Sequence, residues 1–80
     1  MKATLEFNLD DADDKTAHLR AVQSLDMALC LFSIQEDLRA NVKHAPDSME
    51  ELEYKTWVLA RKLVFDNLAK YNIDLDNLLL

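Results

Sequence analysis

The sequence predicts a mainly α-helical fold in which one short N-terminal β-strand and a short helix precede an antiparallel helical hairpin, all within a single domain of residues 1–80. Three observations support this fold class. Residues 2–9 alternate strictly between polar and apolar side chains, which is typical of a half-buried strand. The chain has no glycine and a single proline, Pro46, so it offers few tight turns. Apolar side chains then recur at helical spacing through most of the remaining residues.

The predicted strand at residues 2–9 places Ala3, Leu5 and Phe7 on one apolar face. A lone strand cannot satisfy its own backbone N–H and C=O groups, so it needs a partner strand. One candidate partner is residues 73–75, the only other short stretch of the chain that alternates between apolar and polar side chains. The other candidate is the same strand of a second subunit, related by a two-fold axis. Ala3, Leu5 and Phe7 are therefore candidates for strand pairing, within one chain or between two.

The acidic run at residues 10–14 predicts the start of a helix, because aspartates cap exposed N–H groups and favour the positive end of the helix dipole. The helical pattern continues to about residue 45, far beyond the average helix of about 11–12 residues. We therefore predict a break at Gln23-Ser24, with Ser24 capping the second helix. The two helices are expected at about residues 11–22 and about residues 25–45.

Pro46 marks a boundary, since proline disfavours helix for the residue before it. Ser48 and Glu51 fit a capping box, and Asp47 with Glu50 would serve equally, so the last long helix is predicted at about residues 48–71. Asn72 suits the left-handed position that ends helices. The tail of residues 72–80 is expected to add leucines to the core as a turn or a short helix. Two long helices joined by a short turn should pack as an antiparallel hairpin.

The predicted helix at about residues 25–45 is apolar on two opposite sides. One arc holds Met27, Leu31, Ile34, Leu38, Val42 and Ala45. The opposite arc holds Val22, Leu25, Leu29 and Phe32. A surface helix needs only one apolar face, so we expect the last helix on one side and either the small N-terminal and C-terminal elements or another subunit on the other.

The last helix carries two apolar stripes. The stripe assigned to the core contains Leu52, Thr56, Leu59 and Leu63, with Met49, Ala60 and Val64 beside it. The second stripe contains Tyr54, Val58, Arg61 and Phe65, with Trp57 and Leu68 beside it. Trp, Tyr and Arg are enriched at interface hot spots, although the same aromatics are equally suited to cap the edge of the core within one chain. The candidate residues for a partner or self-interface are Tyr54, Trp57, Val58, Arg61, Phe65, Leu25, Leu29 and Phe32.

The net charge of −6 disfavours direct binding to nucleic acid, whose affinity comes mostly from lysine and arginine on phosphates. The acidic patches contain Asp10, Asp11, Asp13, Asp14, Glu50 and Glu51. Acidic residues gather at the predicted helix starts and basic residues later in each helix, which matches the helix dipoles and gives the patches a structural explanation. Mimicry of nucleic acid is the alternative interpretation of the same charges.

The chain lacks the residues that most enzymes and cofactor sites need. Without glycine it has no phosphate-cradling loop, and its two histidines are far apart with no second cysteine for a zinc site. Its one cysteine, Cys30, cannot form an intrachain disulfide and is expected to pack as a small hydrophobe. We expect no enzyme activity, no cofactor and no metal. Since the core of so short a chain is marginal, we expect a homo-oligomer, with a dimer as the first interpretation.

Membrane insertion is not expected. No apolar stretch approaches the roughly 20 residues of a membrane helix, and no apolar run follows a basic start as in a signal peptide. These features favour an intracellular protein.

The opening Met-Lys-Ala-Thr-Leu-Glu-Phe-Asn-Leu resembles a family of small uncharacterised bacteriophage proteins, whose chains begin with this phrase and continue with proline and acidic residues. The similarity extends to residues 38–39, 42–43 and 50–54, while Asp10 replaces the proline and Gln23-Ser24 matches the small-residue break of the family. The resemblance implies phage origin and the cytoplasm of an infected bacterium, and it implies no catalytic residues.

Three functions follow as hypotheses. The first is a phage-encoded accessory protein that binds, and thereby inhibits, a host or anti-phage defence protein; this rests on an association between small phage proteins and such roles. The second is a self-assembling structural protein with no external target. The third is a nucleic-acid mimic or a sponge for a small ligand.

Overall fold

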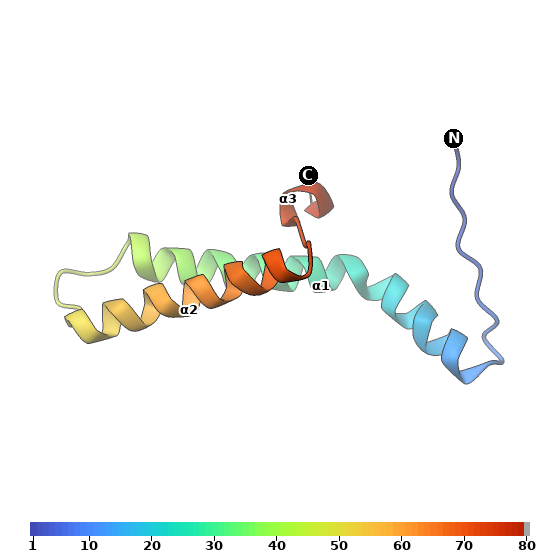
Figure 1. The fold of residues 1–80 in the computed structure, drawn as a ribbon, viewed down its shortest axis with the longest axis horizontal. Coiled ribbons are helices and arrows are strands. Elements are labelled where there is room, and N and C mark those ends of the chain that lie inside the picture. The colour runs from blue at the N-terminus through green and yellow to red at the C-terminus, as the bar shows by residue number, and fades with distance from the viewer. Residues whose placement is uncertain (80) are drawn as a thin grey trace.

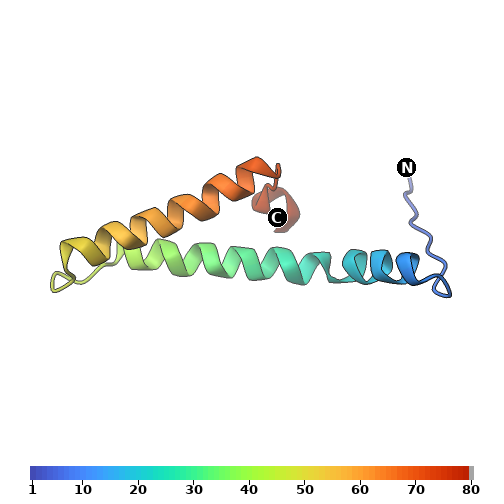
Figure 2. The ribbon, with the colours of Figure 1, turned by 60° about the horizontal axis from the view of Figure 1, so that its bottom comes forward.

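The computed structural model describes residues 1–79 and contains three helices, α1 (Ala12–Lys43), α2 (Glu51–Lys70) and α3 (Leu75–Leu79). Figure 1 shows α1 and α2 running antiparallel as a hairpin, and α3 lying across the middle of α1. The mainly α-helical fold class is therefore confirmed. The hairpin forms one long, thin body, with extents of 56 × 30 × 19 Å (Figure 2).

Helix α1 is continuous over 32 residues, so the predicted break at Gln23-Ser24 and the two separate helices at 11–22 and 25–45 are wrong. Asp11 is the N-cap, and its side chain accepts a hydrogen bond from the Asp13 N–H at 2.9 Å. The Ser24 hydroxyl donates to the Ala21 carbonyl at 2.9 Å, which is a bond made inside a helix and not at its start. No glycine or proline lies within α1, and glutamine and serine cost only a few tenths of a kcal/mol relative to alanine, so nothing in this segment stops the helix.

The predicted N-terminal strand is absent, and no strand occurs in residues 1–79. Residues 1–8 extend from the start of α1 without regular structure (Figure 1). The Asn8 N–H donates to the Asp14 carboxylate at 2.9 Å, and the Phe7 ring meets the His18 ring edge-on with centroids 5.5 Å apart. Alternation is a local pattern, whereas pairing needs a second strand, and residues 73–75 instead lead into α3. Ala3, Leu5 and Phe7 therefore have no strand partner within residues 1–79.

The connection from α1 to α2 is a turn in which the Met49 N–H donates to the Pro46 carbonyl at 3.0 Å. Because Asp47 and Ser48 lie inside this turn, α2 starts only after Glu50, and neither predicted capping box forms. Glu50 makes no side-chain cap bond. The predicted helix at 48–71 is thus present, but it begins at Glu51.

The end of α2 agrees with the sequence prediction, since Asn72 is left-handed with φ 55°. The Ile73 N–H donates to the Leu68 carbonyl at 2.9 Å, and the Asn72 N–H donates to the Ala69 carbonyl at 3.1 Å. These are the two bonds of a Schellman motif. The motif turns the chain sharply and delivers Leu75, the first residue of α3, onto α1.

Replacing Asn72 with alanine should lower the free energy of unfolding by about 1 kcal/mol, because a Cβ disfavours the left-handed conformation that Asn tolerates. Chemical denaturation at fixed chain concentration measures this change. Asn72→Gly is the matched control, since glycine adopts the same φ without a steric penalty. Equal stability of the alanine variant and the glycine variant would contradict a left-handed helix end.

The core of the hairpin is thin, and its only buried side chains within residues 1–79 are Ala28, 5% exposed, and Leu75, 6% exposed. The α2 side chains that face α1 are half-buried: Trp57, Ala60, Arg61, Val64 and Leu68. The stripe predicted as the α2 core is right only in part, because Ala60 and Val64 beside it face α1, whereas its leucines Leu52, Leu59 and Leu63 are 76%, 57% and 55% exposed. Both stripes have helical spacing, and spacing alone does not say which of them meets the neighbouring helix.

Candidate interaction surface

The accessible surface of the chain is larger than a compact monomer of this size would expose. It measures 7016 Å², whereas a folded monomer of 9.2 kDa exposes about 4,900 Å², an excess of about 2,100 Å². The radius of gyration is 17.8 Å, compared with about 12 Å for a compact chain of 80 residues. Many large apolar side chains on both long helices are exposed in the single chain. Clusters of exposed apolar side chains are typical of interaction surfaces.

Part of the excess comes from the unequal lengths of the two helices. Helix α1 has 32 residues and α2 has 20, so α1 is longer by 12 residues, or about 18 Å. The N-terminal part of α1 projects beyond α2 and α3 (Figures 1 and 2). It carries two exposed apolar side chains, Leu19 at 54% and Val22 at 64%.

A row of exposed apolar side chains, which we name the α1 seam, follows one side of α1. Its members, Val22, Leu25, Leu29 and Phe32, are 64%, 57%, 48% and 40% exposed. Their spacing of three, four and three residues is the a/d repeat of a coiled-coil contact. On a helical wheel this seam lies opposite the side of Leu31 and Leu38, the half-buried residues on the α2 side of the helix. The predicted second apolar arc of the middle helix is therefore largely exposed in the single chain, with α3 beside it at Leu25 and Phe32.

Helix α2 exposes two further stripes. We name Leu52, Leu59 and Leu63 the leucine stripe. We name Tyr54, Val58 and Phe65, which are 40%, 41% and 39% exposed, the aromatic stripe. Of the interface residues predicted from sequence, Trp57 and Arg61 are only half-buried and face α1, whereas the other six are exposed.

Arg61 joins the aromatic stripe to the hairpin interior. Its guanidinium carbon lies 5.2 Å from the centroid of the Phe65 ring, a cation–π distance. Its Nε is buried and has no hydrogen-bond partner. Arg61 lines a shallow hollow with Val58, Lys62 and Phe65.

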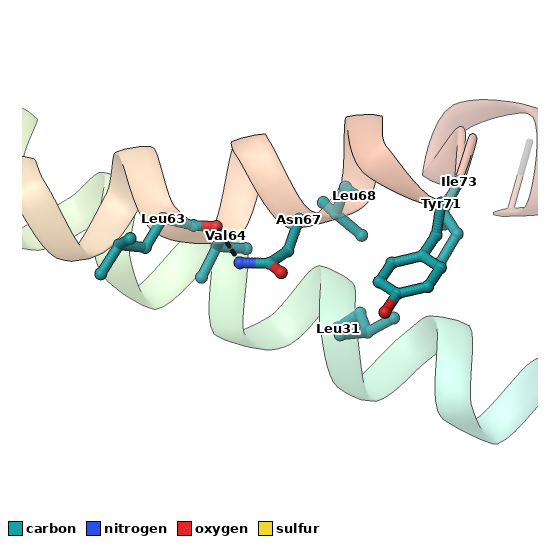
Figure 3. A pocket seen from close by; sticks show the side chains of 7 residues that line it. All are labelled: Leu31, Leu63, Val64, Asn67, Leu68, Tyr71 and Ile73. Carbon is teal, nitrogen blue, oxygen red and sulfur yellow. Dashed lines mark hydrogen bonds between the residues drawn. The ribbon is translucent and has the colours of Figure 1, made fainter.

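An apolar groove of about 300 Å³ lies between α1 and the C-terminal half of α2. Figure 3 shows its lining, which consists of Leu31, Leu63, Val64, Asn67, Leu68, Tyr71 and Ile73. The Asn67 amide donates to the Leu63 carbonyl at 2.8 Å, so this polar group is already satisfied. The groove is suited to apolar side chains. Sequence reasoning missed it because the groove joins Leu31 to residues more than 30 positions away, and only the Schellman turn brings Ile73 beside them.

Several side chains of the acidic patches form capping, hydrogen-bond and ion-pair interactions near the N-termini of α1 and α2. Asp11 caps α1, Asp14 accepts from Asn8, and Glu51 pairs with Lys55 at 3.0 Å. The patches lie at opposite ends of the long axis, since one precedes α1 and the other begins α2 (Figure 1). The six carboxylates Asp10, Asp11, Asp13, Asp14, Glu50 and Glu51 therefore do not form one continuous acidic face.

Cys30 is exposed, so the expectation that its thiol packs as a small hydrophobe is wrong. It lies on α1 outside both the α2-facing side and the α1 seam. Within residues 1–79, no three His, Cys, Asp or Glu side chains come together as a metal site would require. Over the same residues, none of the helices has the length and apolar character to cross a membrane.

Comparisons of the chain with models of known protein families, with curated proteins and with solved structures give no match.

Proposed function

We propose that this chain acts by binding other proteins. The observation that supports this function best is the set of large apolar side chains left exposed, on a chain whose total accessible surface exceeds that of a compact monomer by about 2,100 Å². A specific protein–protein interface takes about 800 Å² from each partner, so the excess is large enough for more than one contact. Two apolar rows at helical spacing supply the proposed contacts, the α1 seam and the aromatic stripe, whereas the leucine stripe is exposed but has no contact assigned to it.

The external partner we propose is a bacterial host protein or an anti-phage defence protein, bound and inhibited in the cytoplasm of the infected cell. The resemblance of residues 1–9 to small phage proteins supports this class of partner. The aromatic stripe supports α2 as the contact. Aromatic side chains bury large areas on binding at little cost in side-chain entropy, and arginine, which lies beside the stripe as Arg61, is also enriched at interface hot spots.

Replacing Phe65 with alanine should weaken binding of the external partner about 30-fold, because an aromatic anchor at an interface contributes about 2 kcal/mol. The partner is first captured on the immobilised chain from a bacterial lysate, then identified and purified. Isothermal titration calorimetry with the purified partner then compares the wild-type chain with Phe65→Ala and Tyr54→Ala.

Leu52→Ala is the control for this experiment, since Leu52 is 76% exposed and lies on the leucine stripe. It should leave the affinity within about threefold of the wild-type value. A loss of binding with Leu52→Ala but not with Phe65→Ala would move the contact to the leucine stripe. If no purified bacterial protein forms a saturable complex with the chain, the external partner is contradicted.

A further inference from the structure

We propose that the α1 seam binds the α1 seam of a second copy of this chain, with the two helices antiparallel across a two-fold axis. The seam offers two heptads of apolar residues at coiled-coil spacing. Its four members are between 40% and 64% exposed in the single chain. Helix α3 flanks one side of the seam, where Leu78 lies beside Leu25 and Leu75 lies near Phe32, but leaves these side chains open to a partner. This contact uses a different helix from the external contact proposed for α2.

The spacing of the seam fixes the register of the pair. Three, four and three residues separate its members, and this order is the same when it is read backwards. An antiparallel pair whose axis passes at the level of Met27 therefore sets Leu25 opposite Leu29 of the second copy. The same axis sets Val22 opposite Phe32 of the second copy. All four side chains of each copy then meet an apolar side chain, as an isologous interface requires.

Polar residues flank the seam in the same register. His18, whose ring also contacts Phe7 of its own chain, lies four residues before Val22, and Glu36 lies four residues after Phe32, so the two are opposite each other across the axis. The acidic first turn of α1, with Asp13 and Asp14, then lies against the basic last turn of the second copy, which holds Lys43. The two helix dipoles are also opposed, which is favourable.

A parallel pair would lose this charge match. It would set Asp14 beside Asp14 and Lys43 beside Lys43, and like charges at close range are destabilising. The N-terminal part of α1, which projects beyond α2 and α3 and contacts residues 7–8 of its own chain, supports the antiparallel choice as well, because it would lie along the α2-bearing half of the second copy. Each overhang of about 18 Å thereby gains a packing surface that its own chain lacks.

The available area agrees with a stable dimer. Obligate homodimer interfaces bury about 2,000 Å² or more in total, or about 1,000 Å² from each copy. The excess surface of about 2,100 Å² per chain covers this need and leaves area for the aromatic stripe of α2. Leu78 of α3, 58% exposed, lies beside Leu25 and extends the seam sideways.

The first test compares two glutamate variants by sedimentation equilibrium. Leu25→Glu on the seam and Leu59→Glu on α2 replace leucines of equal exposure, 57% each, so both should leave the single chain folded. The wild-type chain should be a dimer at micromolar concentration. Leu25→Glu should raise the dimer dissociation constant at least about 100-fold, because it brings one carboxylate from each copy into an apolar contact. Leu59→Glu should change it by less than about threefold.

The second test reads the register with cysteines, in a Cys30→Ser background that removes the native thiol. Val22→Cys and Phe32→Cys chains are mixed, allowed to exchange and oxidised. The antiparallel register brings these two positions together, so a mixed disulfide between the two variants should dominate. Val22→Cys alone should not crosslink, because its two copies would stand about 15 Å apart along the axis.

Four results would overturn the proposal: a monomer at micromolar concentration, a dimer that survives Leu25→Glu, a dimer lost with Leu59→Glu alone, or efficient crosslinking of Val22→Cys to itself. Failure here is separable from failure of the proposed function. A monomeric chain that still forms a saturable complex with a purified bacterial protein overturns only the pairing. A monomeric chain with no such complex overturns both.

Discussion

Replacing Ser24 with proline is expected to divide α1 into two helices and to lower the free energy of unfolding by about 3 kcal/mol or more. Ser24 lies in the middle of the continuous helix Ala12–Lys43. Proline there removes the N–H that donates to the carbonyl four residues earlier, and its ring clashes with that carbonyl. Far-UV circular dichroism should show a loss of helix, and urea denaturation at fixed chain concentration should show the loss of stability.

Ser24→Ala is the control that separates a continuous helix from two capped ones. The Ser24 hydroxyl bonds back to the Ala21 carbonyl at 2.9 Å, so alanine should leave stability unchanged or raise it by a few tenths of a kcal/mol. If Ser24 instead capped a second helix, alanine would lower stability by about 1 kcal/mol. The two arrangements therefore predict opposite signs for the same substitution.

The ends of the helices were largely predictable from local residues. Asp11 and Asn72 act at the termini where the sequence placed them, because capping depends on a side chain and on backbone groups within a few positions. The break at Ser24 was not real, since it was inferred from the average length of helices. Average length is a statistical prior, whereas a helix stops only where a residue or the packing stops it.

Which face of each helix packs against its neighbour was much less predictable. Helix α2 has apolar side chains on three sides, and the side that meets α1 contains Trp57, Val64 and Leu68 and not the leucines assigned to the core. The choice depends on how α1 and α2 rotate about their axes, which is a property of the packed pair. The strand at residues 2–9 failed for the same reason, because pairing needs a partner that the pattern does not supply.

The apolar arc at Val22, Leu25, Leu29 and Phe32 was recognised from sequence, and its exposure in the single chain is what the structure adds. With only Ala28 and Leu75 buried, the hairpin has little apolar burial to offset the entropy of ordering its residues. Pairing along the α1 seam would supply the missing burial. In this arrangement, dimerisation adds to the stability of a hairpin that is folded but only marginally stable alone, so the measured stability depends on chain concentration.

Raising the chain concentration from about 1 to about 100 µM is therefore expected to raise the melting temperature by roughly 9 °C. Mass action stabilises a dimer by about 2.7 kcal/mol for a hundredfold rise in concentration. A dimer of two chains of 80 residues unfolds with an enthalpy of about 110 kcal/mol. The expected shift is the absolute melting temperature multiplied by the stabilisation free energy and divided by this enthalpy. Melting curves followed by circular dichroism at both concentrations measure it.

The Leu25→Glu variant provides the internal control for this experiment. If the seam joins the two copies, the variant should melt at a lower temperature, and its melting temperature should not change between the two concentrations. Leu59→Glu should keep the shift of the wild-type chain. A wild-type melting temperature that is the same at both concentrations would mean that the single hairpin is stable alone, and that its exposed seam needs another explanation.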